Sequence, residues 1–488
     1  MNLNFISGRF YKFFSFWLGP ALFFIFLLFN PLDLEPKAVK VIAIAALMIT
    51  WWIGEALPMP AVALIPLVLF PLMNINTISK TAAPYANEVI FLFMGGFMIG
   101  LAIEKWNLHK RIALSIVKLT GTSGDRIILG FILSTGFISM WLSNTATTMM
   151  MFPIAASVIS VVQTNTSDKQ KAAYFSLSIM LSIAYASNFG GIATIIGTPP
   201  NVAYASFINK HYNYDISFAQ WMIICTPIAV LLLLSLYIVM VKWLYPNRIA
   251  ASEEMKNMIH SNLKELGPMT VPEKRVLTVF LITAGLWITK DLINELKFFR
   301  LDDNMIAVFG ALMMFILPAG DKEKKEEKLL DWSDTKKMAW GILLLFGGGI
   351  TLANALQDAG LIELLGKAIA DYSGTNLLLI VIVITVVSIF MSEVMSNIAQ
   401  VIVIAPVVTG IAEALHINPF MLGLPMTLAA SAASMMPMGT PPNAIVFASG
   451  YIQLKQMIRV GFVMNMVSII LIVLFCYFVL PHIITLGK

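Results

Sequence analysis

The sequence carries little charge for its length. Only 12% of the 488 residues are Asp, Glu, Lys or Arg, whereas an ordinary soluble domain carries about 25%. Apolar residues make up 58%, and the mean hydropathy is +0.83. Water cannot solvate most of the surface of such a chain, which excludes a soluble enzyme, a nucleic-acid-binding protein and a disordered scaffold. The sequence therefore predicts a polytopic membrane protein.

Cysteine and histidine are nearly absent as well. The two cysteines, Cys225 and Cys476, both lie in apolar stretches, so no disulfide framework or cysteine-rich metal site can be built. The five histidines are scattered, and no pair has the spacing of metal ligands. No Ser/His/Asp, paired-carboxylate or Walker-type arrangement is visible. Energy from ATP would therefore have to come from another protein.

Long apolar runs are what the sequence does contain. A helix needs about 20 residues to cross the hydrocarbon core of a bilayer. The first run follows Arg9 and Lys12, contains Pro20 and lacks a small-residue cleavage site, so we interpret it as a retained span. The eleven predicted spans lie near 14–30, 38–53, 56–73, 89–103, 172–196, 218–241, 274–290, 304–318, 338–355, 420–438 and 458–480.

Two further pairs of apolar segments are joined in a different way. Each pair meets at a Ser-Asn-x sequence that has no charge, Gly or Pro at the joint. A turn in the headgroup layer usually carries such residues, so both joints are predicted to lie at membrane depth. We interpret the pairs as re-entrant hairpins, which span residues 124–163 and 375–415.

The charges between the spans predict the orientation of the chain. With Arg9 and Lys12 in the cytoplasm, the basic segments after the fourth span and over 242–275 also lie inside. The mostly acidic segment after the ninth span lies outside, as the positive-inside rule requires. The N-terminus is therefore predicted to be cytoplasmic and the C-terminus external. The residues that carry the outside assignment are Asp358, Glu363, Lys367 and Asp371.

An internal repeat is the most informative feature of the sequence. The Ser-Asn pair at 143–144 recurs at 396–397, and Gly-Thr-Pro-Pro-Asn at 197–201 recurs at 439–443. A pentapeptide that recurs in order behind a second matched motif indicates two homologous halves. Five predicted crossings separate the equivalent segments, so the halves enter the membrane from opposite sides. Inverted repeats with broken helices are typical of secondary transporters, whose site lies near the midplane.

The repeat divides the chain into four parts, and each repeat contains one hairpin and one broken helix. The predicted parts are 1–37 (N-terminal segment and first span), 38–245 (first repeat, with broken helix 172–210), 246–272 (cytoplasmic linker) and 273–488 (second repeat, with broken helix 420–450).

The repeated motifs have a chemistry in common. Two consecutive prolines remove two backbone donors and break the helix. In lipid, the freed carbonyls are costly unless they line a cavity or hold a cation. The tips supply hydroxyl and amide oxygens, which suit hard cations, and they begin helices, whose N-termini attract anions. Two tips and two breaks therefore predict a symmetric site for one anion flanked by cations.

Plainer interpretations stand beside this one. A Ser-Asn pair can simply join helices, and Pro-Pro can simply kink one, although their repetition in the same order favours a site. Glu393 lies close to the second tip, and ionisable residues inside a membrane are functional by default. Its equivalent in the first half is Met140, so a structural hydrogen-bonding role is an equal alternative.

From about residue 38 to 480, the paired Ser-Asn-Thr and Thr-Pro-Pro-Asn motifs resemble the divalent anion/sodium symporter family. This family includes the INDY-type dicarboxylate and citrate carriers. The resemblance implies an all-α, eleven-span homodimer with two re-entrant hairpins and two inverted repeats, which works as an elevator in the bacterial plasma membrane. It also implies Na+ as the coupling ion and no organic cofactor. The expected substrates are C4-dicarboxylates such as succinate, malate or fumarate, then citrate, then sulfate.

The resemblance also implies site residues by motif position. The first sodium site would comprise Ser139, Ser143, Asn144 and the carbonyl of Gly197, and the second Ser392, Asn397 and the carbonyl of Gly439. The substrate would meet Ser143, Asn144 and Thr145 on one tip, Ser396, Asn397 and Ile398 on the other, and Thr198, Thr440 and Pro441 nearby. Ser139 and Ser392 each lie one helical turn before their tip serine.

Ile398 departs from the family pattern, which often has Thr in the second tip. The change removes a hydroxyl and makes that side of the pocket bulkier and drier. Aliphatic residues occupy this position in some citrate-preferring relatives, so the departure bears on substrate choice and not on transport itself.

Three alternatives to a symporter stay open at this point. A related exchanger that swaps dicarboxylates without net sodium flux could keep the same tips. A membrane-embedded enzyme acting on a lipid phosphate would need clustered Asp, His or Arg at the interface, and none cluster near either tip. A channel is the third alternative, but two tips in opposite orientation favour alternating access.

Overall fold

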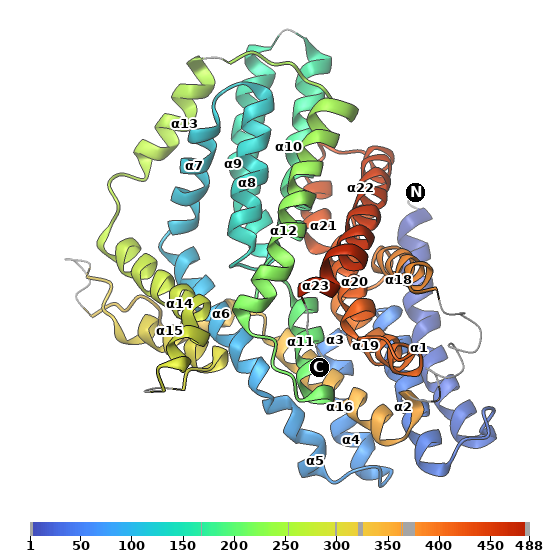
Figure 1. Cartoon of the computed structure of the whole chain (residues 1–488). Helices are drawn as coiled ribbons and strands as arrows, with labels where there is room; N and C mark the ends of the chain where they lie inside the picture. Colours follow the sequence, from blue (N-terminus) through green and yellow to red (C-terminus); the bar gives the residue numbers. More distant parts are fainter. Residues whose placement is uncertain are drawn as a thin grey trace.

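The computed structural model describes residues 3–166, 168–251, 253–297, 300–320, 326–362, 364 and 376–483 (Figure 1). These residues form helices and connecting segments, and the described part of the chain contains no strand beyond one isolated bridge between Pro318 and Lys328. The predicted all-helical class is therefore confirmed. Glu363, Lys367 and Asp371, which support the predicted orientation, lie outside the described residues.

Ten helices in the described residues are long and apolar enough to cross a membrane. Eight of them coincide with predicted spans, and the other two, Asn144–Asn165 and Asn397–Ala414, are second arms of the predicted hairpins. The chain is thus an integral, multi-pass membrane protein. The eight are Lys12–Phe29, Pro36–Ile53, Ile78–Lys105, Lys169–Gly191, Phe218–Leu244, Val271–Glu295, Trp340–Asp358 and Leu454–Ile483.

The three remaining predicted spans are shorter than a full crossing. The span predicted at 56–73 is split into α3 (Met59–Val62) and α4 (Ile65–Leu72), because Pro66 restarts the helix in its first turn. The span at 304–318 is α15 (Asp303–Ile316), and the span at 420–438 is α20 (Phe420–Ser431).

Two helix pairs occupy the stretches predicted as hairpins. The first pair is α8 (Gly124–Ser139) with α9 (Asn144–Asn165), and the second is α18 (Leu377–Ser392) with α19 (Asn397–Ala414). In both pairs the second helix begins at the Asn of the tip, and Ser143 caps α9 by accepting a hydrogen bond from the Ala146 amide at 3.3 Å. Figure 1 shows α8 and α9 side by side at one end of the molecule. Their re-entrant topology stays a prediction.

Each Gly-Thr-Pro-Pro-Asn motif follows a helix break. In the first half α10 (Lys169–Gly191) ends and α11 (Pro199–Tyr212) begins, and in the second half α20 is followed by α21 (Pro441–Ala448). The prolines occupy the first two positions of the new helix, where their missing N–H is not needed. Breaks at the predicted motifs are therefore part of the fold.

The Asn of the motif satisfies the backbone that the break exposes. Asn201 Nδ2 donates to the carbonyls of Gly191, Ile192 and Thr194, at 3.1, 3.3 and 2.8 Å. Asn443 Nδ2 donates to the carbonyl of Met436 at 3.1 Å. The sequence predicted that the carbonyls freed by the break line a cavity or bind a cation. In the structure, the side-chain amides of Asn201 and Asn443 donate hydrogen bonds to several of them.

The two broken helices pack across each other at the centre of the molecule. Helix α10 is the most enclosed of the candidate spans, because 89% of its most apolar stretch is buried inside the molecule. It contacts α8, α9, α12 (Phe218–Tyr237) and α21, whereas α20 contacts α18, α19, α11 and α22 (Leu454–Leu474). The second segment of each broken helix therefore packs on the first segment of the other. Helices α12 and α22 continue as π-helical turns, Ile238–Leu244 and Phe475–Val479, and α23 (Leu480–Ile483) follows the latter.

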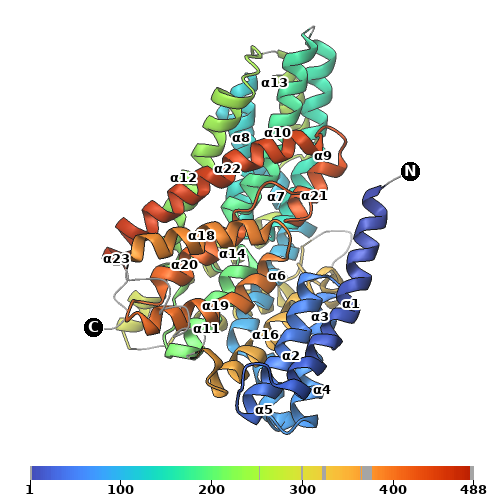
Figure 2. The ribbon, with the colours of Figure 1, turned by 90° about the vertical axis from the view of Figure 1, so that its right-hand side faces the viewer.

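Helices α1 to α5 lie together at the lower right of Figure 2, away from α12 and α22. Helix α1 packs on α2, and α15 packs on α6 and α14. The bounds are α1 Leu3–Phe29, α2 Pro36–Ile53, α5 Ile78–Ala82, η1 Ala83–Ala86, α6 Glu88–Lys105, α14 Val271–Glu295, η3 Trp332–Lys337 and α16 Trp340–Asp358.

Two amphipathic helices link α6 to α8 and α12 to α14. Helix α7 (Leu108–Thr120) follows α6, and α13 (Glu253–Glu265) lies within the predicted linker 246–272 and packs on α7. Arg111 of α7 forms an ion pair with Glu273 at 3.0 Å and donates to the carbonyls of Leu266 and Gly267. This network fixes α7 to the start of α14.

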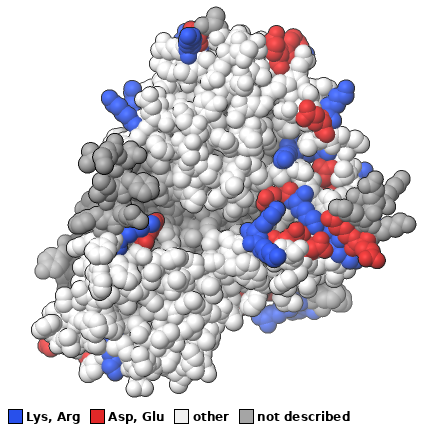
Figure 3. All heavy atoms as spheres, turned by 180° about the vertical axis from the view of Figure 1, so that it is seen from behind, with Lys and Arg blue, Asp and Glu red and all other residues white. Residues whose placement is uncertain are grey.

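Charged side chains gather in a few places on the surface. One face of the molecule is largely free of Lys, Arg, Asp and Glu, apart from a few clusters (Figure 3). In one cluster, Lys105 pairs with Glu327, Asp331 and Asp334 at 3.5, 3.2 and 2.9 Å. The wide uncharged surface is what a lipid environment requires.

Candidate functional site

Both tips and both breaks meet around one cavity of about 630 Å³. This volume lies in the range of pockets that bind small molecules, about 300–1,000 Å³. Of the residues proposed from the sequence, Ser139, Ser392 and Gly197 lie behind the wall, and the others form it. The wall residues in question are Ser143, Asn144, Thr145, Thr198, Ser396, Asn397, Ile398, Gly439, Thr440 and Pro441.

Four helices begin at this cavity. The first residues of α9, α11, α19 and α21 all line it, so the partial positive charges of four helix N-termini converge there. Lys337 is the only basic residue among the described residues of the wall. Since α11 and α21 begin with two prolines that have no N–H, the arrangement can hold an anion mainly through the first N–H groups of α9 and α19 and through hydroxyls.

Oxygen atoms cluster behind the first tip. Ser139 Oγ donates to Asn144 Oδ1 at 2.8 Å, and the carbonyl oxygens of Ser187 and Gly197 lie 3.0 and 3.2 Å from the same amide atom. The serine hydroxyl can donate to an amide oxygen, but the two carbonyls cannot. Either the Asn144 amide turns so that its nitrogen donates to all three, or the oxygens share a hard cation.

The break between α10 and α11 packs closely against this tip because a glycine stands at each end of it. A side chain at Gly191 would collide with Asn144 Oδ1, and a side chain at Gly197 would collide with the backbone of Gly191. The contribution of Ser187 is a backbone carbonyl, so its side chain gave the sequence analysis no signal.

The second tip repeats the arrangement. Ser392 Oγ lies 2.7 Å from Asn397 Oδ1 and 2.6 Å from the carbonyl oxygen of Ala430. Gly439 lies against the tip, where an added Cβ would be 3.3 Å from the Ser392 carbonyl oxygen. Ser392, Asn397 and Gly439 are thus near one another, and the backbone of Ala430 joins them.

The tips differ in how the break is attached. At the first tip, Thr194 Oγ1 donates to the carbonyl of Met140 at 2.5 Å. At the second, the Glu393 carboxylate accepts hydrogen bonds from the amides of Ser434, Met435 and Met436. Since Met140 and Glu393 occupy equivalent positions, a neutral contact in one half corresponds to a charged one in the other.

Sequence reasoning missed Asn188, which joins the two halves. Its Nδ2 donates to Thr440 Oγ1 at 3.1 Å, and its Oδ1 lies 3.5 Å from Asn144 Nδ2. The side chain is 1% exposed and lies on the cavity wall. An amide deep in an apolar helix, two residues before the Gly190-Gly191 pair, was the signal that could have identified it.

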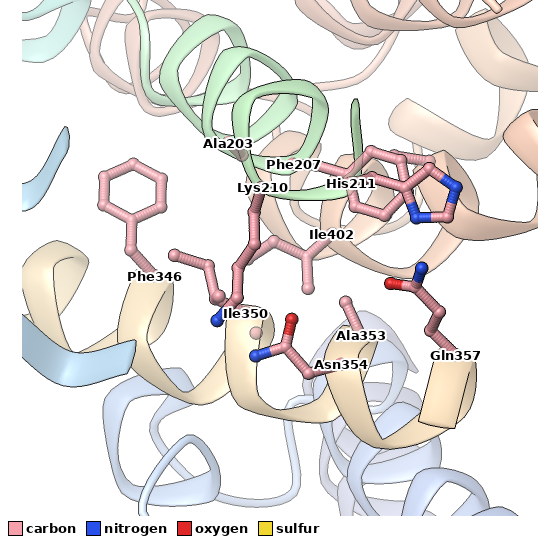
Figure 4. A pocket seen from close by; sticks show the side chains of 12 residues that line it. Ala203, Phe207, Lys210, His211, Phe346, Ile350, Ala353, Asn354, Gln357 and Ile402 are labelled. Carbon is pink, nitrogen blue, oxygen red and sulfur yellow. The ribbon is translucent and has the colours of Figure 1, made fainter. Parts of the chain in front are cut away.

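A second, much smaller cavity of about 20 Å³ lies between α11, α16 and α19. Lys210 of α11 reaches toward Asn354 of α16, among apolar side chains such as Phe346 and Ile402 (Figure 4). This cavity is too small for a dicarboxylate. It marks the place where the hairpin of the second half packs against α16.

The chain matches a family model described as the sodium:sulfate symporter transmembrane region, over residues 16–484. It is 40% identical to the sodium-dependent dicarboxylate transporter SdcS of Staphylococcus saprophyticus over 476 residues, which cover 95% of this chain and 90% of the relative. It is 42% identical to SdcS of Staphylococcus aureus (strain USA300) over 481 residues, with the same shares of the two chains covered.

Two solved transporter structures share the fold at low sequence identity. One is MtrF of Neisseria gonorrhoeae, described as illuminating a class of antimetabolite efflux pumps, with a TM-score of 0.53, 12% identity and coverage of 85% of this chain and 84% of the other. The second is the Alcanivorax borkumensis YdaH transporter, also with a TM-score of 0.53 and 12% identity, with coverage of 89% and 98%.

Proposed function

This chain belongs to the sodium:sulfate symporter family, and from that premise we propose that it is a sodium-coupled symporter of C4-dicarboxylates such as succinate, malate or fumarate. It is a transporter and not an enzyme. The relatives named sodium-dependent dicarboxylate transporters match nearly its whole length. Citrate is the second candidate substrate, because Ile398 replaces the hydroxyl that the family often has there.

One observation carries the proposal. The cavity is lined by the first turns of four helices, and an oxygen cluster lies behind each tip. A dicarboxylate has a negative charge at each end, so one carboxylate would meet Ser143, Asn144 and Thr145. The other would meet Ser396, Asn397 and the first turn of α21, which begins after Thr440. Ile398 would contact the carbon skeleton.

The cations would occupy the oxygen clusters. The first cluster offers Asn144 Oδ1, Ser139 Oγ and the carbonyls of Ser187 and Gly197. The second offers Asn397 Oδ1, Ser392 Oγ and the carbonyl of Ala430, with Gly439 beside it. Each tip asparagine would thus serve a cation through its side chain and the substrate through its helix N-terminus. This arrangement would couple sodium to substrate.

The proposed orientation makes the structure inward-open. Glu55, Glu104 and Lys337 line the cavity together with the tips, and all three lie in segments predicted to face the cytoplasm. The N-terminus would be cytoplasmic and the C-terminus external, in the plasma membrane of a bacterium. The hairpins, broken helices, α12 and α22 would move as an elevator against the remaining helices, which would hold a homodimer.

Cysteine labelling tests this topology. Cysteines at Thr122 and Thr164, at the far ends of α8 and α9, should both label from the cytoplasmic side. Cysteines at Asn376 and Ile417, at the far ends of α18 and α19, should both label from outside. Labelling of Thr122 and Thr164 from opposite faces would overturn the hairpin and the inverted repeat together.

Succinate uptake into proteoliposomes tests the function. An inward sodium gradient should drive accumulation, and potassium in place of sodium should abolish it. Uptake that needs dicarboxylate inside the vesicle and ignores sodium would instead identify an exchanger. Parallel uptake of citrate and sulfate measures the order of substrates.

A further inference from the structure

Glu393 is a buried carboxylate beside the second tip. It caps the C-terminus of α18 directly after Ser392, and its side chain is 4% exposed. Oε1 accepts from the amides of Ser434 and Met435, at 2.9 and 2.8 Å, and from Asn465 Nδ2 at 2.6 Å. Oε2 accepts from the Met436 amide at 2.8 Å. All four partners are donors, which is the environment of an ionised carboxylate, because a carboxylic acid would have to donate one bond.

The charge is held by backbone and not by a cation. Three successive amides, 434–436, surround the carboxylate as a nest, a geometry that suits an anion. Among the described residues, none of the ion pairs involves Glu393. The negative charge is therefore fixed in place, and within the described part of the chain no opposite side-chain charge pairs with it.

This charge lies next to the second oxygen cluster. Gly439 belongs to the same break as the nest, and a Cβ at Gly439 would be 3.0 Å from Glu393 Oε2 and 3.3 Å from the Ser392 carbonyl oxygen. Among the residues that the structure describes, Oε2 accepts one hydrogen bond, so it keeps acceptor capacity on the side of Gly439. The carboxylate thus adjoins Ser392, whose hydroxyl belongs to the cluster.

The first half shows that attaching the break requires no charge. There Met140 stands in the place of Glu393, and the neutral Thr194 hydroxyl holds the break to the tip through the Met140 carbonyl. Both oxygen clusters consist of neutral hydroxyl, amide and carbonyl groups. Glu393 therefore adds to the second cluster an electrostatic contribution that the first cluster lacks.

We propose that Glu393 is a positioning residue of the second cation site, and that its fixed negative charge makes this site bind sodium more tightly than the first and fill before it. The proposal rests on the sodium-coupled function proposed above. A charge in a poorly solvated site attracts a cation more strongly than it would in water. Because the nest already holds the carboxylate, nothing has to rearrange when the cation arrives.

Three substitutions separate charge from hydrogen bonding. Glu393→Gln keeps the size of the side chain and removes its charge together with one of its two acceptor oxygens. Glu393→Asp keeps the charge but is one methylene too short for all four donors, and Asn465→Ser keeps the charge and replaces the amide donor with a shorter hydroxyl. Met140→Gln is the matched control at the equivalent position of the first half.

The measurements are the sodium dependence of thermal stabilisation without substrate and the sodium dependence of succinate uptake, both on the purified full chain. Glu393→Gln should raise the sodium concentration for half-maximal effect at least about tenfold. Glu393→Asp and Asn465→Ser should lower the melting temperature but keep the sodium constant within about threefold, because the charge remains. Met140→Gln should leave the sodium constant unchanged.

Two results would overturn the proposal. In the first, Glu393→Gln responds to sodium as the parent does. In the second, Glu393→Asp or Asn465→Ser raises the sodium constant as much as Glu393→Gln does, which would assign the effect to hydrogen bonding. If Glu393→Gln does not fold, the two charge-retaining variants decide alone: unchanged sodium constants support the proposal and raised ones contradict it. A parent protein without sodium-dependent stabilisation or uptake would instead contradict the proposed function.

Discussion

The two halves of the molecule use one backbone plan with different side chains. Both tips place a serine hydroxyl one turn below an asparagine amide, and both breaks bring a backbone carbonyl to that pair. They differ at the positions around it, where Met140 and Thr145 in the first half correspond to Glu393 and Ile398 in the second. The repeated part builds the oxygen clusters. The unrepeated part is free to make the halves unequal toward the anion and the two cations of the proposed site.

Replacing the repeated asparagines should have the largest effect. Asn144→Ala and Asn397→Ala each remove an amide oxygen from a cluster, and a hydrogen bond to a charged group contributes about 1.5–3 kcal/mol, or roughly 10- to 150-fold in affinity. Transport in proteoliposomes should fall to near background in both variants. Asn209→Ala is a control that should transport normally, because Asn209 lies in the last turn of α11, far along the helix from its start at the cavity.

Equal loss in both halves would support the shared plan. If either variant transports like the parent while its melting temperature is unchanged, the corresponding oxygen cluster is not a cation site.

Much of this shared plan could be predicted from the sequence, because it depends on repeated motifs. The Ser-Asn pairs and the Thr-Pro-Pro-Asn sequences predicted where helices begin and break, since proline and capping residues act locally. The carbonyls of Ser187 and Ala430 could not be predicted, because any residue supplies a carbonyl and only the folded geometry aims it. Asn188 contacts Thr440, which is far away in the sequence, so only the packing of α10 on α21 reveals its role.

The asparagines of the breaks should differ in their effect on stability. Asn201 Nδ2 donates to three carbonyls, whereas Asn443 Nδ2 donates to one. A buried polar group left without its partner costs about 1–3 kcal/mol, so Asn201→Ala should lower the free energy of unfolding more than Asn443→Ala. Thermal denaturation of both variants in detergent measures the difference. Equal melting temperatures would mean that the carbonyls of the first break find other donors.

Asn188 should have a smaller effect, on affinity. Its amide links the first tip to Thr440 of the second half through neutral hydrogen bonds, which contribute about 0.5–1.5 kcal/mol each. Asn188→Ala should therefore weaken the apparent affinity for succinate by about 2- to 12-fold. Uptake at saturating sodium isolates this effect, and Thr440→Val, which removes the other partner of the bond, should weaken affinity to a similar extent. If the double variant shows the sum of both losses, the two residues act independently and the link between the halves carries no coupling.

The smallest change in any single affinity is expected where the tips are least alike. Ile398 lies on the cavity wall and is partly buried, opposite a tip that carries the Thr145 hydroxyl. Ile398→Thr adds a donor for a carboxylate, but the desolvation of the new hydroxyl offsets the gain, so the affinity for one substrate should change by only about 1 kcal/mol.

Selectivity should respond more clearly to Ile398→Thr, because it is a difference between two affinities. The ratio of apparent affinities for succinate and citrate should shift at least about threefold, with the sodium constant unchanged. Thr145→Ile, the reverse exchange on the other tip, should shift the same ratio in the opposite direction, since it removes the one tip hydroxyl at this pair of positions instead of adding a second. Competition of both anions against labelled succinate, on each purified variant, gives the ratio. A lower melting temperature with an unchanged ratio would mean that Ile398 serves the packing of the hairpin, and that the difference between the tips lies in their charges and not in their contact with substrate.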